Sequence, residues 1–174
     1  MSNDGFSAER QACIDKINAL RATDTAVALQ PYTLGNSDMT NTCVDTQATN
    51  DQAANSPHQS FINSSPACSW PGGGSTGGSA QNECLSGYGT DVAGITACLQ
   101  SMWDERLQSQ CTGCIGCTQF GGACPNCDFS GSMGLGECGH YVNMSAPYFL
   151  TVACGFGGGP PSSSSQGWMA QDFE

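Results

Sequence analysis

Only a few residue types in this chain could do chemistry. The 174 residues include two histidines, His58 and His140, and 12 cysteines. A neutral imidazole is a good zinc ligand and can act as a general base near neutral pH. Two histidines in one sequence are nonetheless most often unrelated surface or hydrogen-bonded side chains, so their presence alone predicts no site. No nucleophile elbow accompanies them, so the residues do not predict a Ser-His-Asp hydrolase.

The cysteines are most concentrated between residues 111 and 127. Here Cys111, Cys114, Cys117, Cys124 and Cys127 have the spacing C-x2-C-x2-C-x6-C-x2-C. Closely spaced cysteines occur in zinc and iron–sulfur sites, although this spacing does not match a ferredoxin run. The even total of 12 instead favours disulfide bonds formed in an oxidising compartment. We therefore expect disulfides, with a metal centre as the alternative.

Composition excludes several classes of partner. The formal net charge is −11, and the chain has only four Lys and Arg residues. Such a surface repels the phosphates of nucleic acids and anionic lipids, whereas it favours cationic partners. No stretch approaches 18 apolar residues, so no membrane span is expected. The first residues, MSNDGFSAER, lack the basic end and apolar run of a signal peptide, so we interpret the sequence as a mature or trimmed secreted form.

Hydrophobic periodicity predicts three helices. They cover residues 7–22, 38–54 and 91–110. Ser7 and Asp91 are of the residue types that cap helix N-termini. The third helix has the clearest apolar stripe, and the second is weakened by its threonines.

Strand-forming residues are concentrated near the end of the chain. Residues 140–156, HYVNMSAPYFLTVACGF, predict two strands around a Ser-Ala-Pro turn. Cys138 and Cys154 flank this hairpin, so a bridge between them is plausible, and the other pairings cannot be deduced. Residues 157–174 are interpreted as a Gly/Pro/Ser-rich tail that follows a single domain at 1–156. Helices together with a few strands predict the α+β class.

The segment CGHYVNMSAPYFLTVACGF (138–156) resembles the signature of the CAP superfamily, which comprises cysteine-rich secretory proteins, antigen 5 proteins and pathogenesis-related proteins. Four further segments match the family's motifs in the family's order: CIDKINALRA (13–22), SPHQSF (56–61), AQNECL (80–85) and SMWDERL (101–107). Only the Gly-His-Tyr segment is specific by itself. The cysteine-rich stretch looks more like that of cysteine-rich bacterial members. The resemblance covers nearly the whole chain and implies a disulfide-rich α-β-α sandwich with a small antiparallel sheet between helices.

The resemblance also implies a site. In this family two histidines and two acidic residues line a central cavity, and some members hold a divalent cation there. His58 and His140 match the histidines and Glu105 matches one acidic residue, so Zn²⁺ or another divalent cation is implied. The second acidic position is Gln81, which lacks a charge and a potential base, so both metal binding and water activation should be weaker. Glu83 stands two residues later, but no gap-free alignment places it in the cavity.

The resemblance implies a secreted interaction module that binds an extracellular protein, a lipid or sterol, or a surface ligand, without an organic cofactor. One alternative is an extracellular coat or fibre subunit, because bridged, acidic chains rich in Gly and Ser can self-assemble. The other is a metal-dependent hydrolase that uses His58, His140 and Glu105. Gln81 and the absence of a third histidine count against the hydrolase, and the fold alone does not decide between these functions.

Overall fold

The structure, a computed structural model, describes residues 5–24, 33–34, 37–68, 80–117, 124–129, 138–159 and 167–174, with the backbone only for 33–34 and 37–42. The helices are α1 (Ser7–Arg21), α2 (Ser37–Ala54), α3 (Gln59–Ile62), α4 (Val92–Asp104) and α5 (Gly139–Ser145), with 3₁₀ turns η1 (Glu105–Leu107) and η2 (Ser109–Cys114). The strands are β1 (Thr33–Leu34), β2 (Ala80–Cys84), β3 (Thr151–Gly157) and β4 (Trp168–Phe173). Helices around one small sheet confirm the α+β class.

The four strands form one sheet in the order β1-β3-β4-β2. Strand β4 is antiparallel to both β3 and β2, and β1 is parallel to β3. The interpretation of residues 157–174 as a tail is therefore wrong for 168–173, which form a buried strand inside the sheet. Because both faces of β4 are covered, its sequence does not alternate between apolar and polar residues, and the strand pattern is lost.

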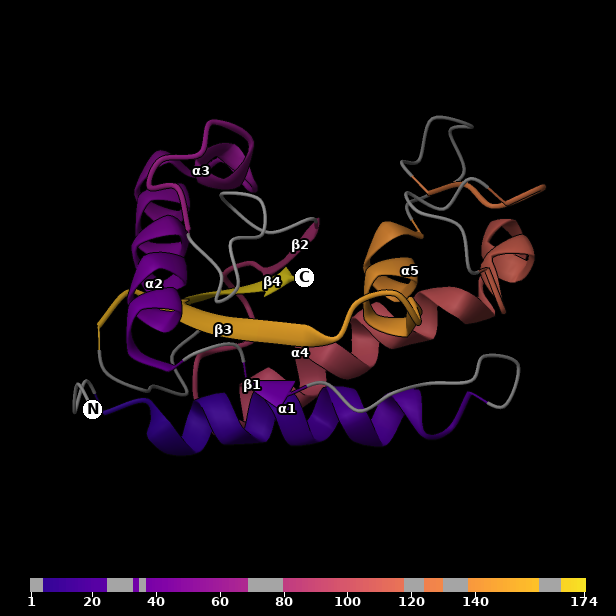
Figure 1. Cartoon of the computed structure of the whole chain (residues 1–174), viewed down its shortest axis with the longest axis horizontal. Coiled ribbons are helices and arrows are strands. Elements are labelled where there is room, and N and C mark those ends of the chain that lie inside the picture. Colours follow the sequence, from indigo (N-terminus) through magenta and orange to yellow (C-terminus); the bar gives the residue numbers. More distant parts are fainter. Residues whose placement is uncertain are drawn as a thin grey trace.

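The two faces of the sheet carry different side chains. One face, here called the apolar face, bears large apolar residues and packs against α1, α4 and α5: Val152, Phe156, Met169 and Phe173. The opposite face, here called the α2 face, bears Ala153, Gly155 and Ala170, and α2 covers it. A Cβ atom on Gly155 would lie 2.3 Å from the carbonyl carbon of Val44, so glycine lets α2 approach closely. Figure 1 shows α1 and α4 running beside β3, with α2 standing across one end of it.

The main hydrophobic core lies under the apolar face. Ile17, Leu99, Trp103 and Tyr141 are fully buried there, and the rings of Trp103 and Tyr141 meet edge to face with centroids 5.0 Å apart. The predicted third helix is confirmed over Val92–Asp104, and Asp91 caps it by accepting a hydrogen bond from the Gly94 N–H at 2.8 Å. The first helix also begins where predicted, although Ser7 is its first residue and not its cap.

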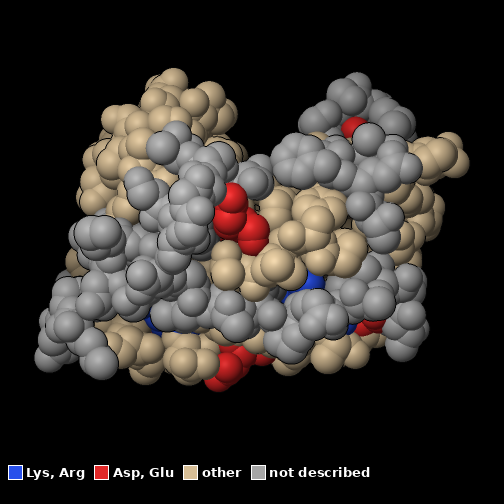
Figure 2. All heavy atoms as spheres, viewed as in Figure 1, with Lys and Arg blue, Asp and Glu red and all other residues tan. Residues whose placement is uncertain are grey.

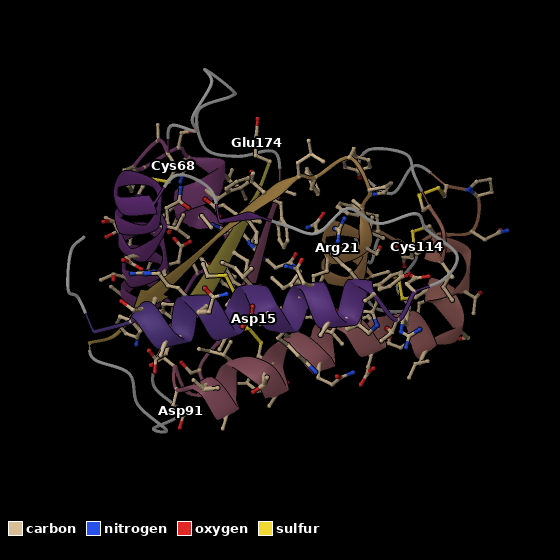
Figure 3. The ribbon with its side chains drawn as sticks, turned by 60° about the horizontal axis from the view of Figure 1, so that its bottom comes forward. Asp15, Arg21, Cys68, Asp91, Cys114 and Glu174 are labelled. Atoms are coloured by element: carbon tan, nitrogen blue, oxygen red, sulfur yellow. A yellow bond between two sulfur atoms is a disulfide. The ribbon has the colours of Figure 1, made fainter. Side chains whose placement is uncertain are left out.

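Residues 139–145 form helix α5, so the predicted first strand of the hairpin is wrong. Its strand-forming side chains, Tyr141 and Val142, are buried in the core, and this packing overrides their local preference. Buried Arg21 supports the end of the helix by donating hydrogen bonds to the carbonyls of Met144 and Ala146 at 2.9 and 3.1 Å. Figure 3 shows Arg21 reaching from α1 toward α5.

All 12 cysteines are paired in six disulfides, which confirms the disulfide prediction for the cysteine-rich stretch. The pairs are 13–154, 43–68, 84–98, 111–138, 114–127 and 117–124. The plausible bridge between Cys138 and Cys154 is wrong: Cys138 pairs with Cys111 beyond α4, and Cys154 on β3 joins Cys13 on α1. Cys114, labelled in Figure 3, belongs to this stretch beyond α4.

In the part of the chain that the structure describes, no helix combines the length and the apolar character needed to cross a membrane.

Candidate functional site

The two histidines, far apart in the sequence, lie close together in the fold. His58 is the residue before α3, and His140 lies in the first turn of α5. Their ring centroids are 6.5 Å apart, with the ring planes tilted by 34°. We call the space between the two rings the notch. Figure 1 shows α3 and α5 on opposite sides of β2 and β4. Figure 2 shows Asp and Glu atoms at the centre and the lower edge of this face, and only small areas of Lys and Arg. The expected proximity of His58 and His140 is therefore confirmed.

Each imidazole is held at Nδ1 by a side chain from another element. His140 Nδ1 lies 2.6 Å from Glu105 Oε1, and the Tyr141 N–H donates to Glu105 Oε2 at 3.2 Å. His58 Nδ1 lies 3.0 Å from Gln81 Oε1. The orientations of both rings are thus fixed by Glu105 and Gln81, the residues that the resemblance places in the cavity.

Gln81 is itself fixed by two buried acceptors. Its Nε2 donates to Asp172 Oδ1 at 2.8 Å and to Gln47 Oε1 at 3.0 Å. The amide nitrogen must face these acceptors, so the amide oxygen faces His58 and His58 Nδ1 carries the hydrogen. A carboxylate at position 81 could not donate to either acceptor. This is the physical reason why glutamine stands at the position where the resemblance expects an acidic residue.

Three buried carboxyl groups lie between the sheet and α2: Glu83 and Asp172 on the α2 face, and Asp51 on α2 itself. Asp51, Glu83 and Asp172 are 1%, 4% and 0% exposed, and each has one oxygen without a donor among the described residues. Burial raises the pKa of Glu83 to about 8, to which the nearby negative charges of Asp51 and Asp172 contribute, although the hydrogen bond from His58 opposes the rise. Burial also raises the pKa of Asp172 to about 8, against the opposing hydrogen bond from Gln81. Both groups are therefore mainly protonated at pH 7.

Glu83 and Asp51 form a carboxyl–carboxyl pair. Two carboxyl oxygens can form a hydrogen bond only when one of them carries a proton. The raised pKa of Glu83 supplies such a proton at neutral pH. We call this pair, together with Asp172, Gln47 and Gln81, the acid network.

The acid network also fixes the backbone at the start of α3. Glu83 Oε2 accepts a hydrogen bond from the His58 N–H at 2.9 Å, and Asp51 Oδ1 accepts one from the Ser60 N–H at 2.8 Å. Between these contacts His58 has a φ of +62°, in the left-handed region that residues other than glycine rarely adopt. Such strain persists only where the surroundings enforce it, and it is concentrated at functional sites.

A cavity of about 250 Å³ adjoins the His140 side of the notch. Its apolar wall consists of Leu85, Tyr88, Met102 and the disulfide between Cys84 and Cys98. Its polar lining consists of Glu83, Ser101, Glu105 and His140, of which Glu105 and His140 contact each other. The arrangement can therefore hold a small group that is apolar along its length and polar at one end.

The residues expected as metal ligands are arranged as hydrogen-bonded pairs in the described part of the chain. In the ranges that the structure describes, no group of three or more His, Cys, Asp or Glu side chains is arranged to hold a metal ion. Nδ1 of His58 faces Gln81 and Nδ1 of His140 faces Glu105, so Glu105 acts here by positioning an imidazole. His58, His140 and Glu105 are thus brought together, but they do not converge on one point as three ligands.

Sequence reasoning missed the acid network. No gap-free alignment with the family places Glu83 in the cavity, but in the structure Glu83 lines it and contacts His58. The sequence could have indicated this position, because Glu83 stands two residues after Gln81, and residues i and i+2 of a strand share one face. Asp172 fell in the presumed tail, and nothing distinguished Asp51 from the other polar residues of its helix.

No protein-family model matches the chain, and neither does any curated protein.

Proposed function

We propose that this chain is an extracellular binding domain of CAP-like architecture, and that its ligand site is the notch between His58 and His140 together with the adjoining cavity. The ordered motifs between residues 13 and 156 support the architecture. The six disulfides support an oxidising, extracellular location, because such bonds persist there and are rare in the reducing cytosol.

One observation carries the proposal: two imidazoles from separate elements converge at 6.5 Å, and buried polar groups orient both. The carboxyl groups of Asp51, Glu83 and Asp172 are costly to bury, since a buried carboxyl group loses its hydration. An array of this kind adds little to stability, whereas convergent polar groups beside an apolar cavity are typical of binding sites.

A divalent cation is the second candidate occupant. The observation in its favour is that Glu105 and Gln81 orient the two rings through Nδ1, as neighbouring acceptors orient the histidines of metal sites. The cation would then bind through Nε2 of each ring, after the rings had moved closer together. Titration with Zn²⁺ in a calorimeter tests this, with the His58→Asn/His140→Asn variant as control. Equal heats for the two proteins would exclude a cation bound by these histidines.

The main proposal is tested by mapping small probes on ¹⁵N-labelled protein by NMR. The panel contains primary amines, carboxylates, a short acyl chain and a soluble sterol sulfate. We expect at least one class to shift the amides of residues 58, 83, 105 and 140 together. The His58→Asn/His140→Asn variant should lose these shifts while keeping a dispersed spectrum. Probes that bind only elsewhere, or that bind the variant equally well, would contradict the proposal.

A further inference from the structure

We propose that the cavity beside His140 accepts one basic side chain, a lysine or arginine, from an extracellular polypeptide. This inference rests on the proposed function and names the chemistry of its ligand. It depends on the size of the cavity, on the division of its lining into an apolar wall and an acidic end, and on the charge of the surrounding chain.

The size of the cavity favours a side chain over a larger lipid. Pockets that enclose drug-sized molecules usually measure about 300–1,000 Å³. At about 250 Å³ the cavity falls below that range, so it cannot enclose a sterol or a long acyl chain. A single long side chain that enters from a bound polypeptide needs less room, because its backbone stays outside.

The apolar wall suits the stem of such a side chain. Leu85 and Tyr88 are 40% and 41% exposed, so they form the accessible part of the lining, and Met102 is buried deeper within it. Lysine and arginine commonly lay their methylene groups on apolar surface while the charged head reaches a polar partner. A tyrosine ring at the entrance also attracts a cation through its face.

The polar end suits a cationic head group. Glu105 accepts one hydrogen bond at each oxygen, from His140 and from the Tyr141 N–H, and a carboxylate has about four acceptor sites. Its side chain is 13% exposed, so a group in the cavity can reach it. No Lys or Arg is among the described residues that line the cavity, so beside the hydrogen bonds from His140 and Tyr141 this carboxylate keeps acceptor sites for a ligand.

The negative charge of the whole chain also favours a basic ligand. A formal net charge of −11 attracts cationic polypeptides and raises the rate at which they encounter the surface. Long-range attraction alone is not specific. The cavity adds selectivity, because it binds a cation tightly only when that cation carries an apolar stem of the right length.

The test compares N-acetyl-lysine methylamide with N-acetyl-norleucine methylamide, which has the same stem without the charge. Titrations of ¹⁵N-labelled protein should show the lysine probe shifting the amides of residues 85, 88, 105 and 140. Its affinity should be at least tenfold higher than that of the norleucine probe, which corresponds to about 1.4 kcal/mol. Equal affinities would overturn the inference.

Three variants locate the interaction. Glu105→Gln should weaken lysine binding by at least about fivefold, whereas Asp15→Asn, which makes the same charge change on the exposed side of α1, should alter it less than twofold. Tyr88→Ala leaves Glu105 and the acid network intact, so it provides the test if Glu105→Gln fails to fold, and it should weaken binding about threefold or more. Equal losses in Asp15→Asn and Glu105→Gln would show diffuse attraction and contradict the inference.

The outcome can be separated from that of the proposed function. If the sterol or carboxylate probes shift the notch and the lysine probe does not, the inference fails and the binding-site proposal stands. If no probe of the panel shifts the notch, both fail.

Discussion

The two faces of the sheet are both buried, but they are filled in different ways. The apolar face carries Val152, Phe156, Met169 and Phe173 and belongs to the main core, which includes Trp103 and Tyr141. Next to its small residues the α2 face carries Gln81, Glu83 and Asp172. Gln81 donates to Asp172 and to Gln47 of α2, and Glu83 accepts from the His58 N–H. Burial of apolar side chains is the main source of folding free energy, whereas burial of carboxyl groups opposes folding.

The apolar face therefore mainly stabilises the fold, whereas the α2 face supports side chains that a ligand would contact. Both histidines are oriented by polar side chains, and His58 is attached directly to the acid network. A buried polar network can specify one arrangement of its side chains at some cost in stability. We therefore interpret the apolar face as the structural half and the α2 face as the half that positions His58, whereas Glu105 at the end of α4 positions His140. The four predictions below test this division, beginning with the largest effect.

Truncation on the apolar side should cause the largest loss of stability. Trp103→Ala removes a fully buried ring, so the free energy of unfolding should fall by about 3–5 kcal/mol, measured by guanidinium unfolding. Leu107→Ala, at a side chain that is 71% exposed, is the control and should change it by less than about 0.5 kcal/mol. A loss below about 1 kcal/mol for Trp103→Ala would contradict the division.

Stability should fall as the pH rises from 4 to 8. The pKa values of Glu83 and Asp172 are raised from 4.5 and 3.8 to about 8, so the folded chain binds more protons than the unfolded chain in this range. The stabilisation is complete below pH 4, where both states are protonated, and is lost as the pH approaches 8. The free energy of unfolding should fall by a few kcal/mol in total, given about 1.4 kcal/mol per pKa unit as the upper limit for each group.

Two variants isolate the cause of this pH dependence. Glu83→Gln and Asp172→Asn each remove one titrating group and should flatten the slope of stability against pH, as measured by urea unfolding at several pH values. Asp15→Asn, at an exposed carboxylate, should leave the slope unchanged. A slope that is equally steep in all three proteins would show that net charge, and not the α2 face, causes the effect.

Restoring the acidic residue that the resemblance expects should destabilise the protein. Gln81→Glu replaces the amide that donates to Asp172 and Gln47 with a further carboxyl group. We expect a loss of about 1–3 kcal/mol at pH 7, the usual cost of an unsatisfied buried partner, and a smaller loss at pH 4. Gln108→Glu, at an exposed side chain, is the control with little expected change. An unchanged or higher stability for Gln81→Glu would contradict the role given to the amide.

The smallest effect on stability is expected at His58. His58→Gly keeps the left-handed backbone without strain but removes the ring, so the two contributions partly cancel and stability should change by less than about 1 kcal/mol. The shifts of the probes that bind the notch should nevertheless be lost. A large loss of stability with unchanged probe binding would assign His58 to the structural half.

The apolar half could largely be predicted from the sequence, because its signals are local. The stripe and the Asp91 cap identify α4, and the even cysteine count identifies disulfides. Residues 139–145 could not be assigned, because their strand-forming side chains become helical only through packing and the support of Arg21. Which cysteines pair depends on the tertiary arrangement, so Cys138 and Cys154 could not be matched to their partners.

The site could be predicted only in part. His58 and His140 were found because they are the only histidines, and their motifs placed Glu105 and Gln81 beside them. The acid network depends on β4, which pairs Asp172 with Gln81 across two strands. Until β4 is recognised as a strand, Asp172 is only a polar residue near the end of the chain.

The most direct test of the account is the protonation of Glu83, because the account requires a buried carboxyl group on the α2 face that keeps its proton at neutral pH. Carboxyl ¹³C chemical shifts, followed from pH 3 to pH 10 in glutamate-labelled protein and assigned with Glu83→Gln, measure it. We predict a midpoint of about 8 for Glu83. A midpoint near 4.5 would mean that this carboxyl group is solvated and that the α2 face is not the buried polar support of the histidines.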